Sequence, residues 1–78
     1  MVMYRDFATR MARKLKLTGK VLNDKDGSVS VIAEGEEESL LEFVPQLQKG
    51  SLLAHVENLM VRWDDATGEF TDFIIAYE

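Results

Sequence analysis

The sequence predicts an α+β fold in which two helices cover one face of a mostly antiparallel β-sheet. Two segments carry apolar residues at the spacing of a one-sided helix, and several shorter segments alternate with the period of two that is typical of half-buried strands. Elements that each have one apolar face bury those faces by packing as two layers. Because the chain has 78 residues and no internal linker, we expect one domain over residues 1–78.

The first helix is predicted over residues 6–17. Phe7, Met11 and Leu15 recur there every four residues, which places them on one face of a helix. Gly19 is expected to end this helix, because glycine readily adopts the left-handed conformation found just after helices. The four residues at the start of the chain are too few to form a full strand before it.

A β-hairpin is predicted over residues 19–35, "GKVLNDKDGSVSVIAEG". Asp26 and Gly27 make a strong turn dipeptide, with a short strand before it and an alternating strand after it. Asn23 fits this pattern less simply, because it follows the first strand before the turn residues begin. Two interpretations stay open: it belongs to a long turn, or its amide is held at the strand end for chemistry.

The second helix is predicted within residues 36–50, "EEESLLEFVPQLQKG". Its first turn contains the glutamates at 36–38, where the helix dipole favours negative charge, so we interpret them as helix-start residues and not as a metal site. Gly50 follows its end, and Pro45 should bend or end its last turn. Its apolar face comprises Leu40, Leu41, Val44 and Leu47.

Two more strands complete the predicted sheet. Residues 57–63 alternate between apolar and polar side chains, and residues 72–78, "DFIIAYE", form the last strand after a glycine-containing turn. The first of these strands carries Leu59, Val61 and Trp63 on one face. The second carries Phe73, Ile75 and Tyr77 on one face.

Composition and charge weigh against several classes of protein. The net charge of −5 argues against nucleic acid as a partner, and the one basic segment, residues 10–16, is interpreted as a solvated helix face. The absence of cysteine rules out disulfides, thiolate metal sites and a cysteine nucleophile. No apolar run approaches the roughly 18–20 residues that span a bilayer, so we expect no membrane partner and a cytoplasmic location.

Few residues in this sequence are suited to catalysis. His55 is the only histidine, so no serine–histidine–acid set can be proposed, and metal-ligand spacings of the H-x-x-x-H or C-x-x-C type do not occur. Arg5 directly precedes the first predicted helix, where unpaired N–H groups and the helix dipole favour a phosphate or carboxylate. Asn23 is a second candidate, although asparagine also favours turns for backbone reasons.

Both candidates lie in segments that resemble the acylphosphatase family. "VMYR", residues 2–5, resembles the end of the family's loop signature, Gly-x-Val-Gln-Gly-Val-x-aromatic-Arg. "TGEFTDF", residues 67–73, is similar to the family's turn into its last strand, and the resemblance covers essentially the whole chain.

The hairpin segment resembles the second acylphosphatase signature. The departures from it are Lys20, where the family usually has an aromatic residue, and Leu22, where it often has a basic or small one. The matching positions are Gly19, Asn23, Gly27, Val29 and Gly35.

The resemblance implies a ferredoxin-like sandwich and an enzyme that hydrolyses acyl phosphates to a carboxylate and phosphate. It implies that Arg5 grips the substrate phosphate and that Asn23 orients the attacking water. Val2, Met3 and Tyr4 match the end of the phosphate loop, so together with Arg5 they are the expected phosphate-binding residues. No metal or cofactor is implied, and the expected ligand is a small acyl phosphate or phosphate.

The resemblance also implies a missing first strand, because the family's first strand and most of its phosphate loop should precede Val2. Residues 28–34 and residues 57–63 would then flank a gap, and unpaired strand edges recruit other strands. We therefore expect the chain to pair with a second copy or to rearrange its own strands, and to turn over acyl phosphate slowly. Two other functions stay open: a non-catalytic anion-binding module of the same fold, and a strand-exchanging interaction module.

Overall fold

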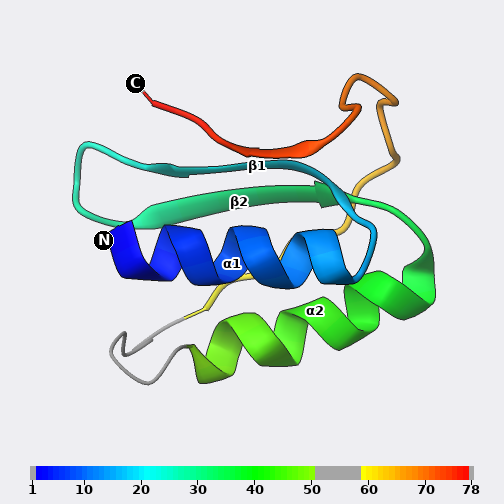
Figure 1. Cartoon of the computed structure of the whole chain (residues 1–78), viewed down its shortest axis with the longest axis horizontal. Helices are drawn as coiled ribbons and strands as arrows, with labels where there is room; N and C mark the ends of the chain where they lie inside the picture. The colour runs from blue at the N-terminus through cyan, green and yellow to red at the C-terminus, as the bar shows by residue number, and fades with distance from the viewer. Residues whose placement is uncertain (1, 51–58, 78) are drawn as a thin grey trace.

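The computed structural model describes residues 2–50 and 59–77, which form one layer of helices and one layer of strands. Both helices lie on the same side of the sheet (Figure 1), so the prediction of an α+β sandwich with its helices on one face is confirmed. The elements in chain order are α1 (Val2–Lys14), β1 (Thr18–Asn23), β2 (Val29–Glu34), α2 (Glu37–Lys49) and β3 (Phe73–Ile75).

The sheet has β1 at its centre, in the order β2-β1-β3. β1 and β2 pair antiparallel, from Thr18 opposite Glu34 to Asn23 opposite Val29. β1 and β3 pair parallel, from Gly19 opposite Phe73 onward. The described sheet is therefore mixed, with one antiparallel and one parallel pair.

The core lies between α1 and the middle of the sheet. Ala8 and Ala12 of α1 are fully buried, and such small side chains let a helix lie close to the strands. The rings of Phe43 and Phe73 meet edge to face, with centroids 6.2 Å apart and an angle of 82° between their planes. This contact joins α2 to β3 across the core.

α1 starts at Val2, four residues before the predicted start, so the expected boundary is wrong. Tyr4 explains the difference, because its side chain is buried and its hydroxyl donates a hydrogen bond of 2.8 Å to the backbone oxygen of Leu47 in α2. The apolar face of the helix therefore begins one turn earlier than the sequence pattern indicated.

α1 ends in a Schellman motif. The N–H of Leu17 donates to the carbonyl of Ala12 at 2.9 Å, and the N–H of Lys16 donates to that of Arg13 at 3.0 Å. The left-handed residue of the motif is Lys16, with φ 61°. The prediction that Gly19 ends the helix is therefore wrong.

Gly19 instead belongs to β1, where it allows a close approach to β2. Its φ is 143°, and a Cβ atom at this position would lie 1.8 Å from the backbone oxygen of Ile32. The residue must be glycine because the neighbouring strand occupies the place of a side chain.

α2 follows the sequence prediction closely. Glu36 is its N-cap residue, Glu37 and Glu38 lie in its first turn, and Gly50 caps its end with φ 73°. The helix continues through Pro45 to Lys49, so the proline does not end it.

The strand predicted over residues 57–63 is wrong for the described part, because residues 59–63 form no strand. Residues 57 and 58, like His55, lie outside the described residues. An alternating pattern forms a strand only where another strand pairs with it, and no described strand lies beyond β2. Trp63 is accordingly half-exposed, at 54%.

The turn before β3 is held by the carboxylate of Glu34, the last residue of β2. Glu34 accepts hydrogen bonds of 2.8 Å from both the N–H and the hydroxyl of Thr67, and one of 3.1 Å from the N–H of Gly68. These donors lower the pKa of the Glu34 carboxyl. The predicted glycine-containing turn is thus hydrogen-bonded, through Thr67 and Gly68, to the last residue of β2.

The last strand is shorter than the predicted residues 72–78, since β3 ends at Ile75. Its alignment with β1 nevertheless continues, because the N–H of Ala76 donates to the carbonyl of Val21 at 2.8 Å.

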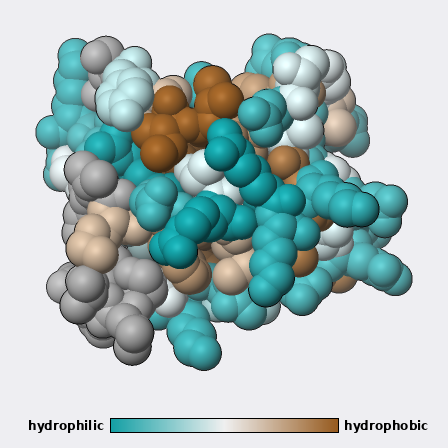
Figure 2. Space-filling model, in the orientation of Figure 1, coloured by the Kyte–Doolittle hydropathy of each residue, from teal (hydrophilic) through white to brown (hydrophobic). Residues whose placement is uncertain are grey.

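The molecular surface is mainly polar on the face seen in Figure 2, with apolar atoms gathered toward the side where β1 and the C-terminal segment run. Neither described helix is long and apolar enough to cross a bilayer.

Candidate functional site

Arg5 and Asn23 lie at the same end of the sandwich. α1 begins at this end and β1 finishes there, because the two elements run in opposite directions (Figure 1). Arg5 lies in the first turn of α1, and Asn23 is the last residue of β1. The prediction that Arg5 precedes the helix is wrong, since α1 already starts at Val2, but the arginine does lie at the N-terminal end of the helix.

The side chain of Arg5 is buried, and no carboxylate of the described residues forms an ion pair with it. Arg5 is only 9% exposed, and its Nε atom has no hydrogen-bond partner in the described part of the chain. Its guanidinium carbon lies 5.4 Å from the ring centroid of Tyr77. A buried cation without a partner is unfavourable, and such a group is well placed to receive an anion.

The other arginines of the described residues differ from Arg5 in this respect. Each forms an ion pair with a carboxylate, and all of these pairs are largely exposed to solvent, whereas Arg5 forms no ion pair within residues 2–50 and 59–77. The pairs are Arg10 with Asp6 at 3.3 Å, Arg13 with Asp72 at 3.7 Å and Arg62 with Asp64 at 2.9 Å.

Asn23 also brings an unpaired polar atom to this end of the sheet. Its side-chain Oδ1 is buried and has no hydrogen-bond partner among the described residues. Buried amide oxygens are nearly always paired in folded proteins, so an unpaired one requires an explanation. Arg5 and Asn23 are the two described residues with such an atom.

The hairpin turn is stabilised without the side chain of Asn23. The hydroxyl of Ser28 donates to Asp24 at 2.9 Å and to Asp26 at 2.6 Å, and its N–H donates to Asp26 at 3.0 Å. These bonds lower the pKa of the Asp26 carboxyl. Because other side chains make the turn, the Oδ1 atom of Asn23 is left available for a ligand.

Val2, Met3 and Tyr4, the predicted phosphate-binding residues, form the first turn of α1 with Arg5. N–H groups in the first turn of a helix have no intrahelical acceptor, and they carry the positive end of the helix dipole. The side chain of Tyr4 packs into the core, and burial raises the pKa of its phenol above the usual 10.0. Tyr4 therefore has only its backbone N–H to offer an anion.

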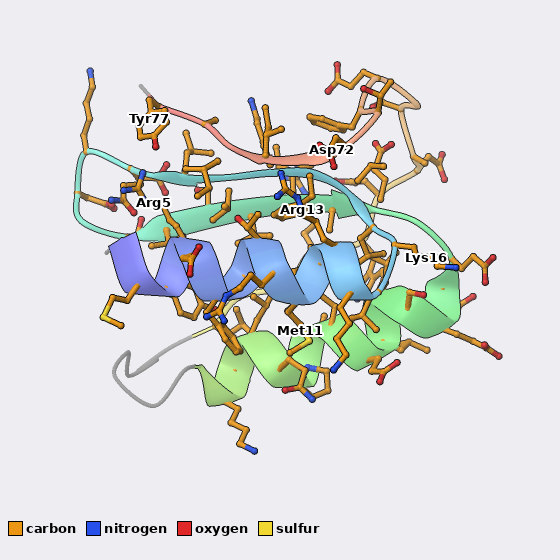
Figure 3. All side chains as sticks on the ribbon, in the orientation of Figure 1. Arg5, Met11, Arg13, Lys16, Asp72 and Tyr77 are labelled. Carbon is orange, nitrogen blue, oxygen red and sulfur yellow. The ribbon has the colours of Figure 1, made fainter. Side chains whose placement is uncertain are left out.

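Tyr77 lies at the same end of the sheet (Figure 3), and sequence reasoning did not identify it as a site residue. The alternating pattern placed it on one face with Phe73 and Ile75. In the structure Tyr77 is 79% exposed, with its ring near the Arg5 guanidinium. No sequence signal links Tyr77 to Arg5, because only the fold brings the two ends of the chain together.

The described parts of the chain contain no cluster of side chains that could bind a metal ion. No three histidine, cysteine or acidic side chains of those parts lie close enough together to hold an ion.

Comparison with known proteins shows similarity over most of the chain. The sequence matches the acylphosphatase family over residues 1–75. An acylphosphatase of Methylococcus capsulatus is 45% identical over 74 residues, covering 95% of this chain and 80% of the relative. An acylphosphatase of Salinibacter ruber is 40% identical over 70 residues, covering 90% of this chain and 74% of the relative. The crystal structure of acylphosphatase from Bacillus subtilis superposes with a TM-score of 0.91 at 36% identity, over 97% of this chain and 84% of that one.

Proposed function

Because the chain belongs to the acylphosphatase family, we propose that it hydrolyses acyl phosphates to a carboxylate and inorganic phosphate at the end of the sheet where α1 begins. The observation that carries this proposal is the pair of unpaired buried polar atoms, Arg5 Nε and Asn23 Oδ1, at this one end. One is a cationic donor and the other is a neutral acceptor, which are the two groups that phosphoryl transfer to water needs.

Arg5 binds the phosphoryl group in this proposal. A planar guanidinium presents parallel N–H groups that match two phosphoryl oxygens, and the absence of a carboxylate partner among the described residues leaves its charge available. Low exposure strengthens the attraction, since water screens a buried charge less.

The first turn of α1 adds a second source of positive potential. The backbone N–H groups of Val2, Met3 and Tyr4 face the same end of the sandwich as Arg5, where the dipole of the 13-residue helix favours an anion. In this proposal they share the phosphoryl oxygens with Arg5.

Asn23 orients the attacking water. Its Oδ1 accepts a hydrogen bond from the water, which directs a lone pair of the water oxygen toward phosphorus. The new bond forms between that oxygen and phosphorus, while the bond between phosphorus and the acyl oxygen breaks. The carboxylate leaves with the bonding electrons, and the proton lost by the water passes to a phosphate oxygen.

This chemistry needs no strong acid or base from the protein. A carboxylate is a good leaving group, so holding the phosphoryl group, offsetting its charge and placing the water supply most of the rate enhancement. Arg5 and Asn23 suit these tasks, and neither has to change its protonation state during the reaction.

We also propose that two copies of the chain pair through β2. β2 is an edge strand of the described sheet, and its sequence "VSVIAE" contains neither the lysine nor the proline that commonly protects edges. An antiparallel pairing centred on Val31 would keep the helix-facing residues of both copies on one side of a continuous sheet. Pairing through this edge leaves the site at the end of β1 accessible.

The test of the proposed activity is benzoyl phosphate hydrolysis by the purified chain. We expect release of benzoate and phosphate above the spontaneous rate, and loss of this excess in Arg5→Ala. A chain that binds phosphate through Arg5 but shows no excess hydrolysis would be an anion-binding module instead. A chain that neither binds phosphate nor hydrolyses benzoyl phosphate would contradict the proposal as a whole.

A further inference from the structure

We propose that Tyr77 is a positioning residue whose ring holds the Arg5 guanidinium in its phosphate-binding orientation. This inference rests on the proposed role of Arg5 and adds a residue from the C-terminal end of the chain to the site. It starts from the aromatic contact of Arg5, in which the guanidinium carbon lies 5.4 Å from the Tyr77 ring centroid. This distance is within the roughly 6 Å over which a cation is attracted to a ring face.

The strand register places Tyr77 level with Asn23. β1 and β3 pair in parallel with Gly19 opposite Phe73 and Val21 opposite Ile75. The same alignment extended by two residues puts Asn23 beside Tyr77, and the bond from the Ala76 N–H to the Val21 carbonyl shows that the chain keeps this alignment past β3.

The alternation of side chains places both residues on the side of the sheet that the helices cover. Val21 and Phe73 are fully buried against the helices. Successive side chains of a strand point to opposite faces, so Asn23 and Tyr77 share the face of Val21 and Phe73. α1 packs over this face, and Figure 3 shows Arg5 and Tyr77 at the same end of the molecule.

A ring suits this position better than a carboxylate would. A carboxylate would pair with the N–H groups of Arg5 in the guanidinium plane and occupy the donors that phosphate needs. A ring that attracts the cation through its π face restrains the guanidinium and leaves the donors at its edge free. This explains how Arg5 can be fixed without an ion pair in the described residues.

Tyr77 is itself held by contacts at the two ends of β3. At the start, the N–H of Gly19 donates to the carbonyl of Asp72 at 2.9 Å, and Arg13 Nε donates to the carbonyl of Phe73 at 3.1 Å. At the other end, Ala76, the residue directly before Tyr77, donates its N–H to the carbonyl of Val21 in β1. The side chain of Tyr77 is largely exposed, so its removal should cost little stability.

The test compares Tyr77→Ala, Tyr77→Leu and Tyr77→Phe by titration with inorganic phosphate, followed by NMR of the backbone amides. We expect phosphate affinity to fall about two- to fivefold in Tyr77→Ala and Tyr77→Leu and to stay unchanged in Tyr77→Phe, because the ring face and not the hydroxyl makes the contact. For benzoyl phosphate, KM should rise in the same two variants while kcat changes less. Trp63→Ala, which removes another exposed aromatic side chain, should leave phosphate affinity unchanged.

Two outcomes would overturn the inference: wild-type affinity in Tyr77→Ala, or loss of affinity in Tyr77→Phe equal to that in Tyr77→Ala. Thermal melts of each variant identify any that fails to fold. The phosphate affinities of Tyr77→Phe and Tyr77→Leu then decide whether the ring is needed, since both variants keep a large apolar side chain. Arg5→Ala separates this inference from the proposed function. Loss of phosphate binding there, with no effect in Tyr77→Ala, would remove only the role of Tyr77.

Discussion

Replacing Gly19 by alanine should strongly destabilise the fold, because β2 occupies the space of the new side chain. The added Cβ would lie 1.8 Å from the backbone oxygen of Ile32 and 2.8 Å from its carbonyl carbon. Backbone atoms cannot rotate away as a flexible side chain does, so β1 and β2 must separate locally. The residue is also held at φ 143°, a conformation that alanine rarely adopts.

The expected cost follows from these two effects. An unfavourable backbone conformation costs about 1–2 kcal/mol and overpacking about 1–3 kcal/mol, which together give about 2–5 kcal/mol. A domain of this size has a total stability of about 4–12 kcal/mol, so the substitution should remove a large part of it.

Gly27→Ala is the matched control, because Gly27 also has a positive φ, of 91°, but a Cβ atom added there would meet no atom within 4 Å. Its cost should be limited to about 1–2 kcal/mol from the backbone. In urea unfolding followed by circular dichroism, with a slope of about 1 kcal/mol per molar, the two midpoints should differ by about 1–3 M. Equal midpoints would show that the contact between Gly19 and β2 does not constrain the fold.

Three further predictions follow from the site, the Glu34 contacts and the β2 edge. Asn23→Ala should lower kcat for benzoyl phosphate by about 10²–10³ while phosphate affinity stays nearly level; a lower melting temperature with unchanged kcat would indicate a turn residue instead. The folded-state pKa of Glu34 lies below its usual 4.5, so its contribution to stability is present above pH 4.5 and is lost as the pH falls through the folded-state pKa. The melting temperature should therefore fall less with acidification in Glu34→Gln than in the wild-type chain. An equal fall in both would refute the role of the Thr67 contacts. Light scattering should give a dimer for the chain and a monomer for Ile32→Lys, which puts a charge on the edge strand; a monomeric wild-type chain at all concentrations would contradict the β2 pairing.

The sequence predicted those helices and strands that are specified by residues close together in the chain. The period of apolar residues located both helices, the turn dipeptide at Asp26 located the hairpin, and the glutamates before Leu40 located the start of α2. The start of α1 was misplaced because Tyr4 gains its place in the helix from a hydrogen bond to Leu47, a residue far along the chain. The role of Gly19 was misassigned for a similar reason, since the close carbonyl of Ile32 belongs to another strand.

The geometry of the candidate site could not be predicted from the sequence, and the roles of its residues stay predictions. Arg5 and Asn23 were found through short motifs, and the structure places both at one end of the sheet with unpaired polar atoms. That Arg5 lacks an ion pair within the described residues could not be known, because pairing depends on which carboxylates the fold brings near. The contact between Tyr77 and Arg5 could not be predicted either, because the two residues lie far apart in the sequence.

The most direct test of the proposed site is phosphate binding by Arg5→Ala beside Arg10→Ala. Both substitutions remove an arginine from α1, but Arg10 is exposed and paired with Asp6, whereas Arg5 is buried and forms no ion pair in the described residues. In NMR titrations of the wild-type chain, phosphate should shift the amides of the first turn of α1 and of Asn23. These shifts should disappear in Arg5→Ala, recover poorly in Arg5→Lys, which has no planar fork of donors, and persist in Arg10→Ala. Shifts that persist unchanged in Arg5→Ala would contradict the assignment of this end of the sheet as the phosphate site.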